Sequence, residues 1–169
     1  THRGGGADAE RFVAAAVEQG GVAVWDTETL QLRASFANAF DPVAFFPDSN
    51  SLIARGTNFF LGTFDIAANA VRQIVPGPPA PVEESWTALS PNGKILALGY
   101  PTGTVSFFDA QSGSLIKAET NAFAGNIFRM VFSPDSAFLA VAGREIEAGR
   151  PGAAKIWDVS TFKIIKWLV

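Results

Sequence analysis

A four-residue turn pattern recurs three times along the chain at nearly constant spacing. Proline is followed by Asp or Asn and then by a small residue at Pro47, Pro91 and Pro134, and these prolines lie 44 and 43 residues apart. Proline presets φ for a turn, and Asp or Asn side chains hydrogen-bond to the nearby backbone there. Short apolar runs flank each turn on both sides. The spacing therefore predicts a repeat of β-hairpins with a period of about 43 residues.

A second pattern, an aromatic residue followed by Asp, interlocks with the first in a fixed order. It occurs four times, as Trp25-Asp26, Phe64-Asp65, Phe108-Asp109 and Trp157-Asp158. The aromatic residues lie 39, 44 and 49 residues apart, and residues 143–152 form an insertion inside the longest interval. Each unit thus contains an apolar run, a proline turn, a second apolar run, a short loop, the aromatic–Asp strand, a turn and a final strand. Four strands in about 43 residues predict a β-propeller blade.

In these motifs the sequence resembles the WD-repeat (WD40) family and the related YVTN-type propellers. Residues 22–26 and 155–158 look like that family's third-strand ending, and residues 128–136 look like its first strand and turn. The resemblance implies an all-β fold of about four consecutive four-stranded antiparallel blades. It covers residues 11–169, with blades at about 11–36, 42–75, 85–118 and 127–168. The first blade lacks its innermost strand, and residues 1–10 are expected to be flexible.

The family's hydrogen-bonded brace, in which a His, a Ser or Thr and a loop Asp hold the Trp, is not expected here. The single histidine is His2, and Gln19, Asn58 and Thr102 stand where the loop Asp would fall. Phe64 and Phe108 have no N–H to donate. The blades should therefore be held mainly by apolar packing, with Trp86 in the core.

The chain should form about half of a propeller, since rings of this family most often have seven blades. A ring that starts on the second strand of a blade must end on the first strand of that blade, whereas this chain ends on a fourth strand. Each blade needs neighbours on both faces. We therefore expect exposed apolar faces on the two end blades, with low stability or self-association as the consequence. Residues 76–84 are a proline-rich connector.

Composition excludes several classes of function. The 13 Lys and Arg residues are scattered and net charge is −3, so no nucleic-acid footprint is expected. Cysteine is absent, which excludes disulfides and thiolate zinc sites. No apolar run approaches the roughly 20 residues that span a bilayer. No phosphate loop, nucleophile elbow or metal-spaced histidine pair occurs, so neither cofactor nor metal is expected. The compartment stays open, with the cytoplasm favoured.

Two hypotheses for function remain. The first is a non-catalytic scaffold whose partners are another protein and the remaining blades of the propeller. Its binding rim would carry Tyr100 as an anchor and the surrounding polar residues Thr102, Arg144, Glu145, Glu147, Arg150, Arg55 and Asn58. The alternative is half of a propeller enzyme or sensor domain whose active site lies in the missing blades. Glu145 and Glu147 could act as paired carboxylates, but a solvated loop explains them too. The four repeat aspartates are interpreted as turn caps rather than as a carboxylate ring.

Overall fold

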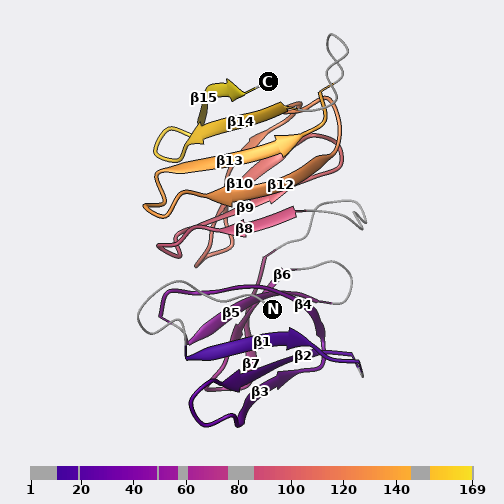
Figure 1. Ribbon diagram of the computed structural model, residues 1–169, viewed down its shortest axis with the longest axis vertical. Helices are drawn as coiled ribbons and strands as arrows, with labels where there is room; N and C mark the ends of the chain where they lie inside the picture. The colour runs from indigo at the N-terminus through magenta and orange to yellow at the C-terminus, as the bar shows by residue number, and fades with distance from the viewer. Residues whose placement is uncertain are drawn as a thin grey trace. The chain divides into compact units, whose positions relative to one another are not determined.

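The computed structural model describes residues 11–18, 20–48, 50–56, 61–75, 86–145 and 153–168, and Figure 1 shows these residues as strands joined by turns. They form antiparallel sheets and no helix, so the prediction of an all-β chain built from such sheets is confirmed. In this part of the chain no helix is long and apolar enough to cross a membrane. The chain divides into two compact units, Thr1–Pro81 and Val82–Val169, and each contains two sheets.

The first unit contains a three-stranded and a four-stranded sheet. The first sheet has the order β1-β2-β3 and the second the order β4-β5-β6-β7. Their strands are β1 (Phe12–Ala16), β2 (Val22–Asp26), β3 (Leu32–Phe36), β4 (Ala39–Phe45), β5 (Ser51–Gly56), β6 (Leu61–Asp65) and β7 (Ala70–Val75). Residues 39–41, which the sequence placed in a loop, belong to β4 because Ala39 and Asp41 pair with the end of β5.

The second unit contains two four-stranded sheets. The third sheet follows the chain from β8 to β11, and the fourth sheet from β12 to β15. Their strands are β8 (Trp86–Leu89), β9 (Ile95–Gly99), β10 (Val105–Asp109), β11 (Leu115–Glu119), β12 (Ile127–Phe132), β13 (Phe138–Gly143), β14 (Ala153–Asp158) and β15 (Lys163–Leu168). The expected flexible residues 1–10 and the connector at 76–84 lie outside the described residues.

Every sheet carries the same irregularity at its aromatic–Asp pair. A β-bulge precedes the aromatic residue, which then pairs with an apolar residue of the next strand. The four pairs are Trp25 with Leu32, Phe64 with Val71, Phe108 with Leu115, and Trp157 with Ile164. A bulge adds twist and redirects side chains. The aromatic residue therefore occupies an equivalent position, directly after the register shift, in all four sheets.

The Asp of each pair closes the turn that follows the strand. Its Oδ1 accepts backbone N–H hydrogen bonds from residues two or three positions further on, as at Asp26 from Glu28 and Thr29. Asp65, Asp109 and Asp158 do the same for their own turns. Four residues after the Asp, each turn has a residue with left-handed φ: Leu30 (58°), Asn69 (50°), Gly113 (69°) and Phe162 (52°). Only the glycine adopts this conformation without steric cost.

The alternation of side chains gives each sheet two distinct faces. We call the face that carries Trp25, Phe64, Phe108 or Trp157 the aromatic face, and the other the opposite face. In the first unit, the opposite face of the first sheet packs on the aromatic face of the second, and the rings of Phe36 and Phe64 lie 4.8 Å apart. In the second unit, the opposite face of the third sheet packs in the same way on the aromatic face of the fourth.

Two expectations about aromatic residues have opposite outcomes. Trp157 is fully buried, and its Nε1 donates to no acceptor among the described residues, as expected for a fold without the brace. Trp86 was expected in the core, but its side chain is exposed. It is the first residue of β8, opposite Gly99, so it has no larger side chain beside it across the strand pair.

Candidate functional site

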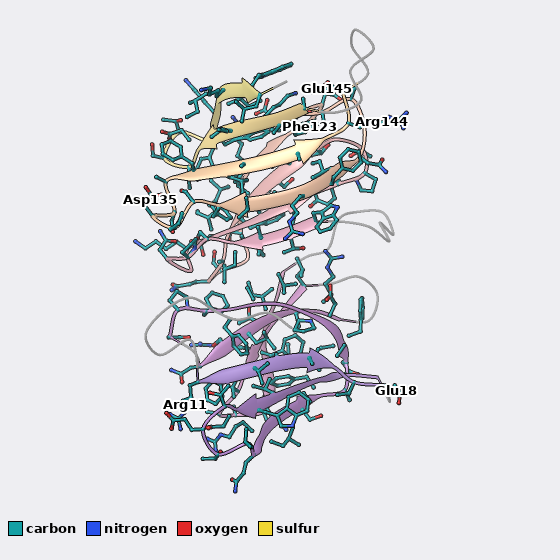
Figure 2. The ribbon with its side chains drawn as sticks, viewed as in Figure 1. Arg11, Glu18, Phe123, Asp135, Arg144 and Glu145 are labelled. Carbon is teal, nitrogen blue, oxygen red and sulfur yellow. The ribbon has the colours of Figure 1, made fainter. Side chains whose placement is uncertain are left out.

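Three segments of the second unit meet at one end of its two sheets. They are the β9–β10 turn (residues 100–104), the β11–β12 connector (120–126), and residues 144–145 after β13; together we call them the loop end. Figure 2 labels Phe123, Arg144 and Glu145 there, and Asp135 at the other end of the same unit. Backbone hydrogen bonds join the segments, from Phe123 N to Gly103 O (3.0 Å) and from Arg144 N to Asn126 O (2.8 Å).

Two glycines allow this close approach. Gly103 has φ +79°, and a Cβ there would lie 2.0 Å from the Phe123 carbonyl oxygen. A Cβ on Gly143 would lie 2.6 Å from the Phe123 ring. Any larger residue at either position would push the connector away, so both glycines are required by contact with one residue, Phe123.

A buried lysine binds two segments of the loop end. Lys155 on β14 is 3% exposed, and its ammonium group forms an ion pair with Glu145 and donates a hydrogen bond to the Ala122 carbonyl. The same Nζ lies 4.5 Å from the Phe123 ring centroid and 3.9 Å from that of Trp167. We call these residues the Lys155 cluster. Because a buried charge is costly unless it is paired, the cluster ties β14, β15, the connector and Glu145 into one arrangement.

Lys155 was not among the residues predicted from the sequence, although a signal for it exists. The residue two positions before the repeat aromatic shares its buried face, and in the other sheets it is Ala23, Gly62 or Ser106, all small. A lysine at this position departs from the repeat. The other repeats have a small residue at this buried position. A charged side chain there indicates a buried ion pair, and this could have been predicted from the sequence.

Above the cluster, the loop end presents a mainly polar surface. Thr102, Asn121, Asn126 and Arg144 are exposed. The stem of Arg144 runs beside Gly125, and its guanidinium forms no ion pair with any residue in the described part of the chain. Arg144 is thus an exposed cationic residue on this surface.

Tyr100 does not have the exposed position expected of an anchor. Its side chain is half-buried. Burial raises the pKa of the Tyr100 hydroxyl, and a hydrogen bond with the Ser106 side chain partly offsets that rise. The Tyr100 hydroxyl is thus engaged with Ser106 of β10.

The remaining predicted rim residues have different locations. Arg55 lies at the end of β5 in the first unit, where its Nε is 3.6 Å from Asp41 Oδ2. Burial lowers the pKa of Arg55, and the charge of Asp41 acts against this. Asn58, Glu147 and Arg150 lie outside the described residues. The structure therefore brings together Tyr100, Thr102, Arg144 and Glu145.

The candidate carboxylates are engaged in structural roles. Glu145 pairs with Lys155, so it is not free to act with Glu147. Backbone N–H groups of its turn, above all that of Thr29, lower the pKa of Asp26 to about 2, with a contribution from Arg11 at 3.2 Å. Hydrogen bonds within their turns also lower the pKa of Asp109 and Asp158. The described residues contain no group of three or more His, Cys, Asp or Glu side chains that could hold a metal ion.

The chain matches no protein-family model, and no curated protein is significantly similar to it in sequence.

Proposed function

We propose that the protein is a non-catalytic scaffold of the WD-repeat type, and that its loop end binds a protein partner. In this proposal the four sheets are consecutive blades of a larger propeller. The repeated bulge, the Asp-capped turn and the packing of an opposite face on an aromatic face support it, because all three recur with the repeat. These are properties of a stacked array, in which each unit is completed by its neighbours.

The observation that carries the binding role is the way the loop end is held. Backbone hydrogen bonds join its three segments, and the Lys155 cluster fixes Glu145 directly after β13. A surface that is already ordered loses little conformational entropy on binding, so more of the contact energy appears as affinity. Loops fixed on a rigid sheet are the usual location of recognition residues.

Arg144 gives this surface its chemical preference. Arginine is enriched at protein interfaces because its planar guanidinium both stacks and forms several hydrogen bonds. Beside it lie Thr102, Asn121 and Asn126, which are exposed and uncharged. A partner that places a carboxylate against Arg144 among polar groups would complement this surface.

A photo-crosslinking experiment tests the proposal. A benzophenone amino acid replaces Asn126, beside Arg144, in one variant and Asp135, at the other end of the second unit, in a matched control. After irradiation in the producing cells, discrete protein adducts are expected at position 126 and not at 135. The same probe at Thr102 should capture the same partner, and adding Arg144→Glu to that variant should reduce its yield about tenfold. Equal labelling at positions 126 and 135, or none at 126 and 102, contradicts the proposal.

A further inference from the structure

Each sheet has one face without a counterpart within its own unit, and the faces that the first and fourth sheets leave in this way are complementary. In each unit, the opposite face of the earlier sheet packs on the aromatic face of the later sheet. The first sheet makes this contact with its opposite face, so its aromatic face, with Val13, Trp25 and Leu32, has no counterpart in the first unit. The fourth sheet makes the contact with its aromatic face, so its opposite face has no counterpart in the second unit.

The opposite face of the fourth sheet is apolar and hollowed. Val131, 58% exposed, pairs with Ala140, which in turn pairs with Ile156 on β14. These residues line a hollow of about 370 Å³ with Phe138, Ile165 and Lys166. In the third sheet the equivalent positions are Ala88, Ala97 and Phe107, which belong to or pack against the core of the second unit. The fourth sheet thus carries a packing face that is exposed to solvent.

The left-handed residue of the aromatic–Asp turn shows how such a face is filled. In the second unit this residue is Phe162; its ring lies 4.9 Å from the Phe107 ring, and its carbonyl accepts a hydrogen bond from Lys117 Nζ at 3.0 Å. In the first unit it is Asn69, whose Oδ1 accepts a hydrogen bond from Ser35 N at 2.9 Å. In both units the turn of the later sheet contacts the earlier sheet through this residue.

Leu30 is the corresponding residue of the first sheet. It is 80% exposed and has φ +58°, so it combines an exposed apolar side chain with a conformation that leucine rarely adopts. Phe162 contacts the opposite face of the third sheet through Phe107 and Lys117, so the same position in the first sheet implies that Leu30 should contact the opposite face of another sheet. In the fourth sheet the equivalents of Phe107 and Lys117 are Ile156 and Lys166, because Ile156 pairs with Lys166 as Phe107 pairs with Lys117. Both line the hollow.

We propose that the chain associates with a second copy of itself head to tail, with the aromatic face of one copy's first sheet packed on the opposite face of the other copy's fourth sheet. Leu30 enters the hollow, and Lys166 donates a hydrogen bond to the Leu30 carbonyl, as Lys117 does to Phe162.

Charge favours this pairing over contact between two fourth sheets. Arg129 and Lys166 both lie on the opposite face of the fourth sheet, since Arg129 pairs with Ala142 and Lys166 with Ile156. Two such faces would bring like charges together. The aromatic face of the first sheet carries no charge at Val13, Trp25 or Leu32 and offers the indole ring of Trp25, on which a cation can stack favourably.

Sedimentation velocity of the 169-residue chain over a wide concentration range tests the proposal. The wild type should gain mass with concentration. Leu30→Asn should weaken association about tenfold or more, because it removes the inserted side chain while Asn tolerates the left-handed conformation. Val131→Asp should do the same from the other face. Ile116→Asn, at an exposed apolar position on β11, is the matched control and should associate like the wild type.

Mixing distinguishes head-to-tail contact from symmetric contact. Leu30→Asn retains an intact fourth sheet and Val131→Asp an intact first sheet, so an equimolar mixture should form 1:1 dimers and nothing larger. Strand content by circular dichroism confirms that each variant is folded, and Ile165→Asp replaces Val131→Asp if that variant is not. A wild type that stays monomeric, a Leu30→Asn variant that associates normally, or a mixture that stays monomeric overturns the proposal. None of these outcomes bears on crosslinking at the loop end, so the two proposals can fail separately.

Discussion

The two units share one repeat but differ in how their sheets are tied together. The first unit has a largely apolar junction, with a core that runs from Phe12 to Ile66, and Ser35 N donates across it to Asn69. The second unit adds polar links from Asn92 N to Ser136 Oγ and from Lys117 Nζ to the Phe162 carbonyl, and it also has the Lys155 cluster. Apolar packing is therefore sufficient to stack two of these sheets, and the added polar links lie in the unit that carries the loop end.

Among substitutions that test this difference between the units, replacement of Lys155 should cause the largest loss of stability. Lys155→Ala leaves the Glu145 carboxylate without its buried partner and should lower the free energy of unfolding by about 3–5 kcal/mol. Replacing both residues, as Lys155→Met with Glu145→Gln, should recover most of the loss, because no buried charge then remains unpaired. Urea unfolding followed by tryptophan fluorescence measures both. Lys163→Ala, at an exposed site on β15, is the control, and a loss below about 1 kcal/mol for Lys155→Ala would show that the cluster is not stabilising.

Gly20 and Gly103 have the same φ but different surroundings, so alanine substitutions there distinguish the cost of backbone strain from the cost of a steric clash. Gly20 in the first unit and Gly103 in the second both have φ +79°, but a Cβ on Gly20 meets nothing within 4 Å, whereas one on Gly103 meets the Phe123 carbonyl. Gly20→Ala should cost about 1 kcal/mol from the left-handed backbone alone. Gly103→Ala should cost about 2 kcal/mol more, because the connector must move. Equal losses in urea unfolding would mean that the connector yields freely.

Protonation of Asp26 at acidic pH should destabilise the first unit. Its folded pKa of about 2 lies below the model-peptide value of 3.8, so the stability it contributes is complete above about pH 4 and is lost as pH falls toward 2. Asp26→Asn should reduce stability at neutral pH and flatten its dependence on pH in this window. Unfolding measured between pH 5 and pH 2 tests this, and an unchanged slope in the variant would assign the acid sensitivity to other carboxylates.

The repeat pattern was enough to predict the strands and the turn role of the aspartates, since both follow from local chemistry that recurs in register. It could not predict the burial of Tyr100, because its hydrogen bond with Ser106 depends on how the β9–β10 turn folds back. The start of β4 was missed for a similar reason: Asp41 looks like a loop residue, but cross-strand pairing with Arg55 overrides that preference. The left-handed turn position was visible only at Asn69 and Gly113, because Leu30 and Phe162 give no such signal.

The smallest changes in the free energy of unfolding should come from substitutions at the left-handed turn position, and they should have opposite signs in the two units. Leu30→Gly relieves the left-handed strain of an exposed side chain, and after allowing for the greater freedom of glycine in the unfolded chain it should stabilise the first unit by about 0.5 kcal/mol. Phe162→Gly relieves the same strain but loses the ring contact with Phe107, so it should destabilise the second unit by about 1 kcal/mol. Both are measured by urea unfolding at low protein concentration, where association does not contribute. If Leu30→Gly is destabilising there, the Leu30 side chain already makes a contact within the monomer, and its exposure would no longer point to a second copy.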